Sequence, residues 1–467
     1  MAPDPSTRDR VAFSNDMAPD PSTRDLKPVL IITYYWPPAG GSGVQRFLKF
    51  SAYLPAYGLE PVILTCSNAT WPVRDHSLCD EVPQQTQVHK AYSLNPFSLY
   101  SRLTGKSAEE LADPAISLSS SITTPGRSGK LVRWIRANLF VPDARIGWVP
   151  FARRKALKLI DTHDIKTVIT TGPPHSTHLI GTWLAARRPV RWIADLRDPW
   201  TEIHYNRLLP RSSLAKRIDA QLERRVLCRA HELVVTAPGT ARYYEQKSGR
   251  SVHTIVNGFD ERDFEPPSHN RSEQIGFCER STLLVRHTGT ISESSIPHGL
   301  LQAMLLDSMS GVQLECTGSC HGYLRRFIGE HQMEQRIVLR AYVPHTEAVR
   351  LMQQADVNLV VVQQSSDSRM LIPGKLYDAL AAGRPILLLG DPDGDAAAIL
   401  DRCGMGRAFH YDDVSGIGQW LIRARARLYM DSAGSAGSIA GFDPVPEEIA
   451  RFSRKKLTEK LARLLHG

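Results

Sequence analysis

The fold of this chain is decided by Pro28-Val-Leu-Ile-Ile-Thr33, which runs into Tyr34-Tyr-Trp-Pro-Pro-Ala-Gly-Gly-Ser-Gly43. The first part is a short apolar run of the kind that forms a buried parallel strand. A helical pattern follows from Val44 to Ala56, and Pro61-Val-Ile-Leu-Thr65 is a second apolar run. A strand, a glycine-rich loop, a helix and a strand in this order predict a βαβ unit.

The same unit recurs outward from this stretch. Further strands of a first series are predicted at 166–170, 192–195, 231–236 and 251–256, with a helix near 176–186. A second series of strands is predicted at 282–289, 313–316, 336–339, 357–362 and 385–389. Two such series predict an α/β protein with two Rossmann-like, doubly wound domains. Ligands of parallel sheets bind beyond the carboxyl ends of the strands, so we expect a central cleft where the two domains face each other.

The predicted domains span 26–265 and 274–430. The polar, proline-bearing segment 265–273 is the predicted linker. A basic helix is expected at 446–465, and we expect it to pack back on the first domain. Met1-Ala-Pro-Asp-Pro-Ser-Thr-Arg-Asp9 recurs word for word as Met17 to Asp25. Because this repeated segment is rich in proline and aspartate, residues 1–25 are expected to be a disordered leader.

Composition limits the class of protein. The chain has 467 residues, of which 42% are hydrophobic and 22% charged, as in globular domains. It has no run of about 18 apolar residues, so no transmembrane helix is predicted. The start does not resemble a signal peptide, and we expect a cytoplasmic protein whose seven cysteines stay reduced. Cys316 and Cys320-His321 lack a second ligand pair, so no metal site is predicted.

The net charge of +9 indicates an anionic partner. Segment 127–158 holds nine basic residues and one acid, Asp143. Within it, residues 130–140 alternate basic and apolar side chains at helical spacing, with Trp134 and Phe140 available for an interface. This pattern predicts a helix on an anionic membrane surface, at the inner face of the plasma membrane. The competing interpretation is a solvated helix face whose apolar side belongs to the core.

Two loops have the chemistry of anion sites. Loop 38–43 can aim backbone amides at a ligand in front of a helix N-terminus, although a tight turn would have the same composition. Gly374 and Lys375 are expected to open a helix, where amides and one ammonium would hold a diphosphate. Asp378, one turn later, could accept hydrogen bonds from a ribose. Lys375 and Asp378 could equally be a solvated pair.

Seven motifs together resemble the family 4 glycosyltransferases of the GT-B fold, within a bacterial subgroup that builds cell-surface polysaccharides. They are Tyr34-Tyr-Trp-Pro-Pro-Ala-Gly-Gly-Ser-Gly-Val-Gln-Arg46, Pro142-Asp-Ala-Arg-Ile-Gly-Trp148, Thr171-Gly-Pro-Pro-His-Ser176, Ala194-Asp-Leu-Arg-Asp-Pro-Trp200, Asn257-Gly-Phe-Asp260, His287-Thr-Gly-Thr290 and Ile372-Pro-Gly-Lys375. The resemblance implies retaining transfer of a sugar from a nucleotide-diphosphate sugar, without a metal or other cofactor. It places the nucleotide in the second domain and a glycan or lipid-linked acceptor against the first.

The resemblance also implies roles for single residues. It assigns Gly41, Gly374, Lys375 and Asp378 to the donor site, together with Gly289 of the motif 287–290, and it places His175 near the donor sugar. Arg369 could share the phosphate charge with Lys375 in the donor site, and Arg46 is expected on the acceptor side. Asp195, Arg197 and Asp198 stand at the carboxyl end of a predicted strand and are candidates to orient the acceptor. The predicted catalytic group is His175, Arg197, Asp198 and Lys375. Many members carry two glutamates eight positions apart, and here Met370 and Asp378 stand at those positions.

Other interpretations remain open. Arg197 and one neighbouring aspartate could form an internal salt bridge, and His175 could be a structural histidine. A nucleotide-sugar epimerase of the same fold, or a non-catalytic membrane-docked protein, would carry similar motifs. No nucleic-acid partner is expected, because zinc-finger and aromatic RNA-binding signatures are missing from the sequence.

Overall fold

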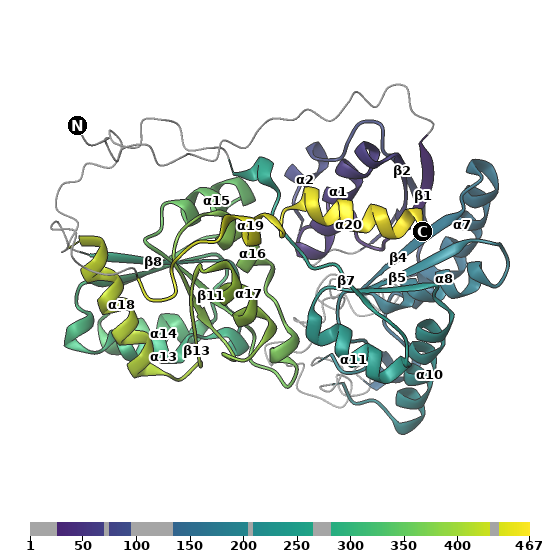
Figure 1. The fold of residues 1–467 in the computed structure, drawn as a ribbon. Coiled ribbons are helices and arrows are strands. Elements are labelled where there is room, and N and C mark those ends of the chain that lie inside the picture. Colours follow the sequence, from purple (N-terminus) through teal and green to yellow (C-terminus); the bar gives the residue numbers. More distant parts are fainter. Residues whose placement is uncertain (1–25, 70–73, 95–133, 204–208, 265–281, 430–438) are drawn as a thin grey trace, which may run out of the picture.

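The computed structural model describes residues 26–69, 74–94, 134–203, 209–264, 282–429 and 439–467. The predicted leader 1–25, the linker 265–273 and the basic residues Arg127, Lys130 and Arg133 lie outside the described residues. The described chain forms two lobes, each built on one parallel sheet with helices on both faces (Figure 1). The two-domain, doubly wound prediction is confirmed.

The first sheet has the strand order β3-β2-β1-β4-β5-β6-β7 within the described residues. Its strands are β1 (Lys27–Ile32), β2 (Leu59–Cys66), β3 (Gln87–Ala91), β4 (Thr167–Gly172), β5 (Arg191–Leu196), β6 (Glu232–Val235) and β7 (His253–Thr254). Its helices are α1 (Ser42–Tyr53), η2 (Leu54–Tyr57), α2 (Ser77–Asp80), η3 (Ile146–Trp148), α7 (Val149–His163), η4 (His175–Thr177), α8 (His178–Ala185), α10 (Ser213–Arg229), α11 (Pro238–Ser248) and η5 (Glu261–Asp263).

Alternate residues of β1 explain why this sheet is covered on both faces. Ile31 pairs with Ile63 of β2 and with Ile169 of β4, so β1 lies in the middle of the sheet. Val29 and Ile31 are buried in one apolar cluster with residues of α1. Leu30 and Ile32 are buried in a second cluster with residues of α7 and α8. A strand buried on both faces reads as a continuous apolar run, as the sequence does here.

The second sheet has the order β10-β9-β8-β11-β12-β13. Its strands are β8 (Leu283–Thr288), β9 (Val312–Thr317), β10 (Ile337–Arg340), β11 (Val357–Val361), β12 (Ile386–Leu389) and β13 (Gly406–Phe409). Its helices are η6 (Glu293–Ser295), α13 (His298–Met304), η7 (Asp307–Met309), α14 (Gly322–His331), α15 (His345–Gln353), η8 (Ser368–Met370), α16 (Gly374–Ala381), α17 (Asp395–Cys403), α18 (Val414–Tyr429) and α19 (Pro446–Ala450).

Strands β3 and β13 are the two that the sequence did not predict. Each lies at the edge of its sheet, and each contains polar side chains, such as His89 in β3 and Arg407 in β13. An edge strand needs less apolar surface than a central one. Its sequence therefore lacks the apolar run that marks the other strands.

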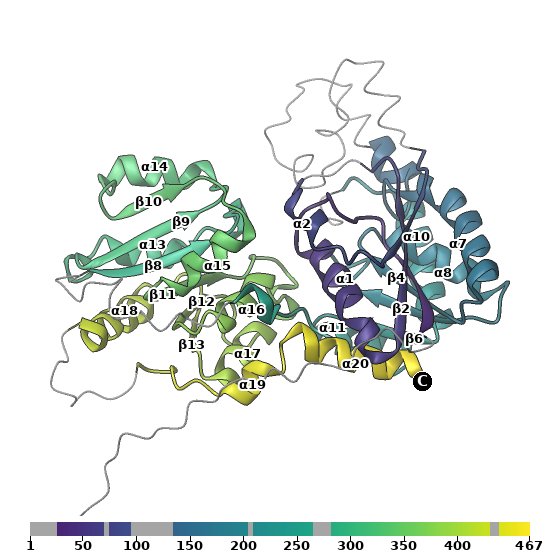
Figure 2. The same ribbon diagram turned by 90° about the horizontal axis from the view of Figure 1, so that it is seen from above.

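The tail forms two helices, α19 and α20 (Arg454–His466), where the sequence predicted one over 446–465. The interruption is a new helix start at Ser453, whose hydroxyl accepts a hydrogen bond from the amide of Lys456. Helix α20 lies against α1 of the first lobe (Figures 1 and 2). The hydroxyl of Tyr57 donates to the carbonyl of Lys455, and Leu457 and Leu461 are buried in the same apolar cluster as α1.

The basic segment 127–158 does not form one surface in its described part. Arg145 is buried, with its guanidinium over the ring of Tyr34 at 5.4 Å. Helix α7 turns Ala152, Ala156 and Leu159 toward the sheet. This agrees with the competing interpretation, in which the basic side chains lie on a solvated helix face and the apolar side belongs to the core. Trp134 and Leu139 remain exposed. No described helix has the length and apolarity that crossing a bilayer requires.

Candidate active site

A cavity of about 680 Å³ opens between the carboxyl ends of the two sheets. The first lobe lines it with Tyr35, Ala39, Gly40, Gly41, Gly43, Val44, Pro173, Arg197, Asp198, Pro199, Thr236, Thr240 and Asn257. The second lobe lines it with His287, Thr288, Gly289, Thr290, Ser295, Val360, Val361, Gln363, Met370, Leu371, Ile372, Pro373, Gly374 and Lys375. The cavity thus lies where parallel sheets bind ligands.

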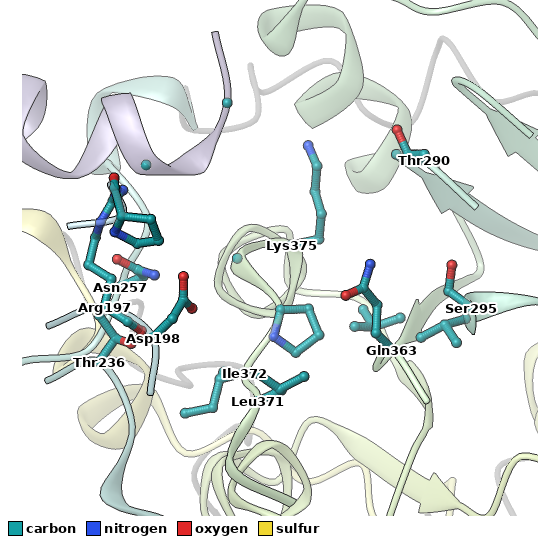
Figure 3. A pocket seen from close by; sticks show the side chains of 18 of the residues that line it. Arg197, Asp198, Thr236, Asn257, Thr290, Ser295, Gln363, Leu371, Ile372 and Lys375 are labelled. Atoms are coloured by element: carbon teal, nitrogen blue, oxygen red, sulfur yellow. Dashed lines mark hydrogen bonds between the residues drawn. The ribbon is translucent and has the colours of Figure 1, made fainter. Parts of the chain in front are cut away.

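Helix α16 provides the cationic wall of the cavity. It begins at Gly374, and the preceding Pro373 supplies no side-chain cap for its first amides. Lys375 is 38% exposed and rises between Arg197, Asp198 and Asn257 on one side and Thr290, Ser295 and Gln363 on the other (Figure 3). Uncapped amides and a neighbouring ammonium attract an anion. The wall therefore suits a diphosphate.

The glycine loop before α1 shapes the opposite wall. Gly41 has φ +100°, which favours glycine, and its carbonyl accepts a hydrogen bond from the amide of Val44 at 3.1 Å. A Cβ atom on Gly43 would lie 2.1 Å from Nη1 of Arg197. The guanidinium of Arg197 therefore occupies the space that the missing side chain leaves.

Arg197 is fixed by the backbone around it. Its Nε donates to the carbonyl of Gly172 at 3.1 Å, and its Nη2 donates to that of Pro173 at 2.6 Å. Its own carbonyl accepts from the hydroxyl of Thr236 at 2.7 Å. Asp198 follows it in the cavity wall. The structure thus brings these two predicted residues into the cleft.

Arg46 and Asp195 do not reach the cavity, contrary to their predicted acceptor-side role. They form a buried ion pair at 2.7 Å, and each residue is 1% exposed. Asp195 also accepts from the hydroxyl of Thr171, and Arg46 donates to the carbonyl of Val256. The pair braces α1 against β5. The ion-pair partner of Asp195 is thus Arg46, which is 149 residues away in the sequence.

His175 also lies away from the cavity, where the sequence placed it beside a donor sugar. It is 4% exposed and stacks on Trp200, with ring centroids 4.8 Å apart. Burial, with His178 and Arg197 nearby, lowers its pKa well below the ordinary value. Pro173, two residues earlier, lines the cavity instead. This position fits the structural interpretation of His175.

Arg369 and Asp378 are the other predicted donor residues outside the cavity wall. The guanidinium of Arg369 pairs with Asp391 at 2.6 Å and Asp393 at 3.3 Å, and its side chain is 65% exposed. Its surface ion pairs explain why it does not face the cleft. Asp378 is 15% exposed and lies 3.9 Å from Lys375. Burial raises the pKa of Asp378, and Lys375 opposes this rise.

The two lobes also touch beside the cavity. The carboxylate of Asp395, at the start of α17, accepts a hydrogen bond from the amide of Gly239 at 2.6 Å and one from Arg242 at 3.3 Å. It therefore caps α11 of the other lobe. Met370 packs here as well, because a Cβ on Gly239 would lie 2.7 Å from its Cγ. The side chain of Met370 thus gives the cavity an apolar wall at this point.

Several polar residues of the cavity were missed as site residues in the sequence. They are Asn257, His287, Thr290, Ser295 and Gln363. Asn257 and Gln363 directly follow predicted strands, and His287 is among the last three residues of one. This position near the carboxyl end of a strand was a signal that could have found them. Among the described residues, no group of three or more histidine, cysteine, aspartate or glutamate side chains could hold a metal ion.

Comparisons with known proteins agree with this geometry. Residues 40–258 match the family described as a glycosyl transferase 4-like domain. No curated protein sequence matches the chain. Sucrose-phosphate synthase from Thermosynechococcus elongatus is 14% identical, with TM-score 0.59, over 94% of this chain and 98% of that one. Anabaena HepE in complex with UDP and glucose is 14% identical, with TM-score 0.58, over 94% and 99%. WaaG, a glycosyltransferase involved in lipopolysaccharide biosynthesis, is 12% identical, with TM-score 0.54, over 94% and 100%.

Proposed function

Because residues 40–258 match a glycosyl transferase 4-like domain and the chain has the GT-B fold, we propose that this protein transfers a sugar from a nucleotide-diphosphate sugar to an acceptor. The observation that carries the proposal is the cavity itself. Lys375 and the uncapped start of α16 lie on one side, and Arg197 and Asp198 lie on the other. The structures of HepE with UDP and with UDP-glucose support a donor of this class.

The proposed mechanism assigns the phosphate charge to α16. The bond between the sugar's anomeric carbon and the phosphate oxygen breaks, and negative charge develops on the leaving diphosphate. Lys375 and the first amides of α16 stabilise that charge, which is the largest contribution that fixed groups make to such a step. No metal is then required for the same purpose.

The acceptor is proposed to approach from the first lobe. Its hydroxyl oxygen bonds to the anomeric carbon on the face that the phosphate leaves, so the configuration is retained. The hydroxyl proton passes to the leaving phosphate oxygen, and the nucleoside diphosphate departs. Arg197 and Asp198 orient the acceptor hydroxyl and are not needed as the base.

We propose a glycan or lipid-linked acceptor in cell-surface polysaccharide synthesis. Exposed apolar side chains lie on α10 and on the helical turn 134–139, namely Trp134, Leu139, Leu214 and Ile218. The side chain of Asn138 links these two elements, because it bonds to the backbone of Pro210 and Ser212. Lys216 and Arg217 are exposed beside them. Apolar and basic side chains together suit the anionic inner face of a membrane, where the protein would sit peripherally.

Binding and turnover test the proposal together. UDP-, GDP-, ADP- and TDP-glucose would be compared by thermal shift, because a ligand at about 100 times its Kd adds about 2.7 kcal/mol of stability. We expect one donor to raise the melting temperature and to release its nucleotide when a glycan acceptor is added. Interconversion of the sugar without nucleotide release would instead indicate an epimerase. If no donor binds, the proposed function is wrong.

A further inference from the structure

His287 holds an unusual position in the cavity wall. It lies near the carboxyl end of β8, and it is 7% exposed. Its Nδ1 lies 3.0 Å from the carbonyl oxygen of Leu359 on the neighbouring strand β11. Its Nε2 is buried and has no hydrogen-bond partner. A buried polar atom without a partner costs free energy, so this nitrogen calls for an explanation.

The bond to Leu359 fixes which nitrogen carries the proton. A carbonyl oxygen can only accept a hydrogen bond, so Nδ1 must be the protonated nitrogen. In the neutral ring Nε2 then carries no proton. Its lone pair can only accept a hydrogen bond. Burial and the nearby charge of Lys375 lower the pKa of His287 to about 4, so the ring is neutral at pH 7.

The space beside Nε2 belongs to the proposed donor site. A Cβ atom on Gly289 would lie 3.6 Å from Nε2 and 3.9 Å from Cε and Cγ of Lys375. The missing side chain thus leaves a gap between the imidazole and the lysine stem. Lys375 is 38% exposed, so its flexible stem can shift to admit a ligand group.

Only some groups of a nucleotide sugar can fill this gap. Diphosphate oxygens carry no proton at neutral pH, so they cannot donate to Nε2 and would meet its lone pair unfavourably. A hydroxyl can donate to Nε2 and accept from the ammonium of Lys375 at the same time. His287 therefore distinguishes a hydroxyl from a phosphate.

We propose that His287 is a specificity-determining residue that accepts a hydrogen bond from a hydroxyl of the nucleotide-sugar donor. The inference rests on the proposed function and assigns a role within the same site. The hydroxyl belongs either to the ribose or to the transferred sugar. Both lie next to the diphosphate of the nucleotide sugar, and either hydroxyl can donate a hydrogen bond to Nε2.

The test compares the wild type with His287→Phe, which keeps an aromatic ring and removes the acceptor. Calorimetry would measure the Kd of UDP, UDP-glucose, 2′-deoxy-UDP and 3′-deoxy-UDP. If the hydroxyl is on the sugar, the variant loses at least about tenfold in affinity for UDP-glucose and keeps its affinity for UDP. If it is on the ribose, UDP and UDP-glucose weaken alike, and one deoxy-UDP binds both proteins equally.

Two results would overturn the inference. Unchanged affinity of the variant for all four compounds would do so, and so would an equal loss for all four, because that indicates a packing defect. His287→Gln is the second variant if the first does not fold, since its amide oxygen ends near the place of Nε2; it should retain most of the affinity. Failure of the wild type to bind any of the four donors of the thermal-shift panel refutes the proposed function, whereas binding without dependence on His287 refutes this inference alone.

Discussion

Lys375 and Arg369 show how differently two predicted phosphate-binding cations can be placed. Lys375 lines the cavity, whereas Arg369 is held at the surface by Asp391 and Asp393. We expect Lys375→Ala to lower kcat by at least about 100-fold, as the loss of one transition-state donor does. Arg369→Ala should change kcat less than about twofold. The measurement is nucleotide release with a saturating donor, and equal losses in both variants would contradict the assignment.

The buried histidines His175 and His178 predict an acid-sensitive stability. Burial lowers the pKa of His178 to about 3 and that of His175 well below its ordinary value. In the unfolded chain both have the ordinary pKa near 6.5, so the unfolded state binds more protons below that pH. The free energy of unfolding should therefore fall as the pH drops from 6.5 toward 3.

His178→Asn tests this acid sensitivity. His178 should contribute a loss of about 1.4 kcal/mol between pH 7.5 and pH 5.5. The variant should lose about 1.4 kcal/mol less than the wild type over that interval, as measured by urea unfolding. The same decrease in both proteins would show that His178 titrates normally in the folded state.

At the residue scale the sequence located the cavity but not every side chain in it. Gly41, Gly289, Gly374, Lys375, Arg197 and Asp198 were predicted and line the cavity. Each lies in the segment that follows a strand or at the start of the next helix, so topology places its backbone at this edge of the sheets. Whether a side chain turns to the cleft or to the core depends on partners remote in sequence. Arg46 and Asp195 turn to the core because they form a buried ion pair with each other.

Gly43 in helix α1 is expected to affect activity through the position of Arg197, and this can be tested with Gly43→Ala. Alanine suits a helix better than glycine by about 0.5–1 kcal/mol, so Gly43→Ala should not weaken α1 itself. Its Cβ would, however, displace the guanidinium of Arg197 from the cavity wall. We expect at least about a tenfold loss of kcat/KM with unchanged or higher Tm.

Gly329→Ala is the matched control for Gly43→Ala. Gly329 lies in α14, and a Cβ there meets no atom within 4 Å. This variant should keep full activity and gain a little stability. If Gly43→Ala is equally active, the loop does not act through Arg197.

Helices α11 and α17 are joined across the two lobes by Asp395. Asp395→Ala removes the cap of α11, and loss of a cap costs about 0.5–2 kcal/mol. Asp395→Asn should lose less, because an amide oxygen can also cap. Urea unfolding would measure both, with Asp401→Ala on the exposed side of α17 as the control at less than about 0.5 kcal/mol. If Asp395→Ala leaves the free energy of unfolding unchanged, this contact between the lobes is dispensable for stability.

At the scale of elements, the central strands of the described sheets could be predicted, whereas two of the four edge strands, β3 and β13, could not. Central strands are buried on both faces and appear as apolar runs, whereas β3 and β13 carry polar side chains at sheet edges. The break at residues 451–453 was also missed. A single helical pattern can continue across a short interruption, and only the cap at Ser453 marks the new start.

The molecule as a whole should bind anionic membranes through α10. Leu214→Glu combined with Ile218→Glu places two acids on the exposed apolar side of that helix. We expect this variant to stop sedimenting with phosphatidylglycerol vesicles while its activity on a soluble acceptor is kept. Leu428→Glu, on the exposed part of α18 in the other lobe, should still sediment. Unchanged sedimentation of the α10 variant would place the membrane contact elsewhere.

Because α20 packs against the first lobe, the two domains do not simply follow one another along the sequence. The first domain is discontinuous, since it needs residues 26–264 and also the last helix, and the second domain is inserted between them. The chain ends beside the place where the first strand begins, because His466 bonds to the carbonyl of Tyr57 and the carbonyl of Gly58 accepts from the amide of Lys27. A circular permutant that joins residue 467 to residue 26 and opens between 264 and 282 would therefore turn a nested arrangement into two consecutive domains. A simple truncation after residue 264 would instead leave the apolar face of α1 without its cover.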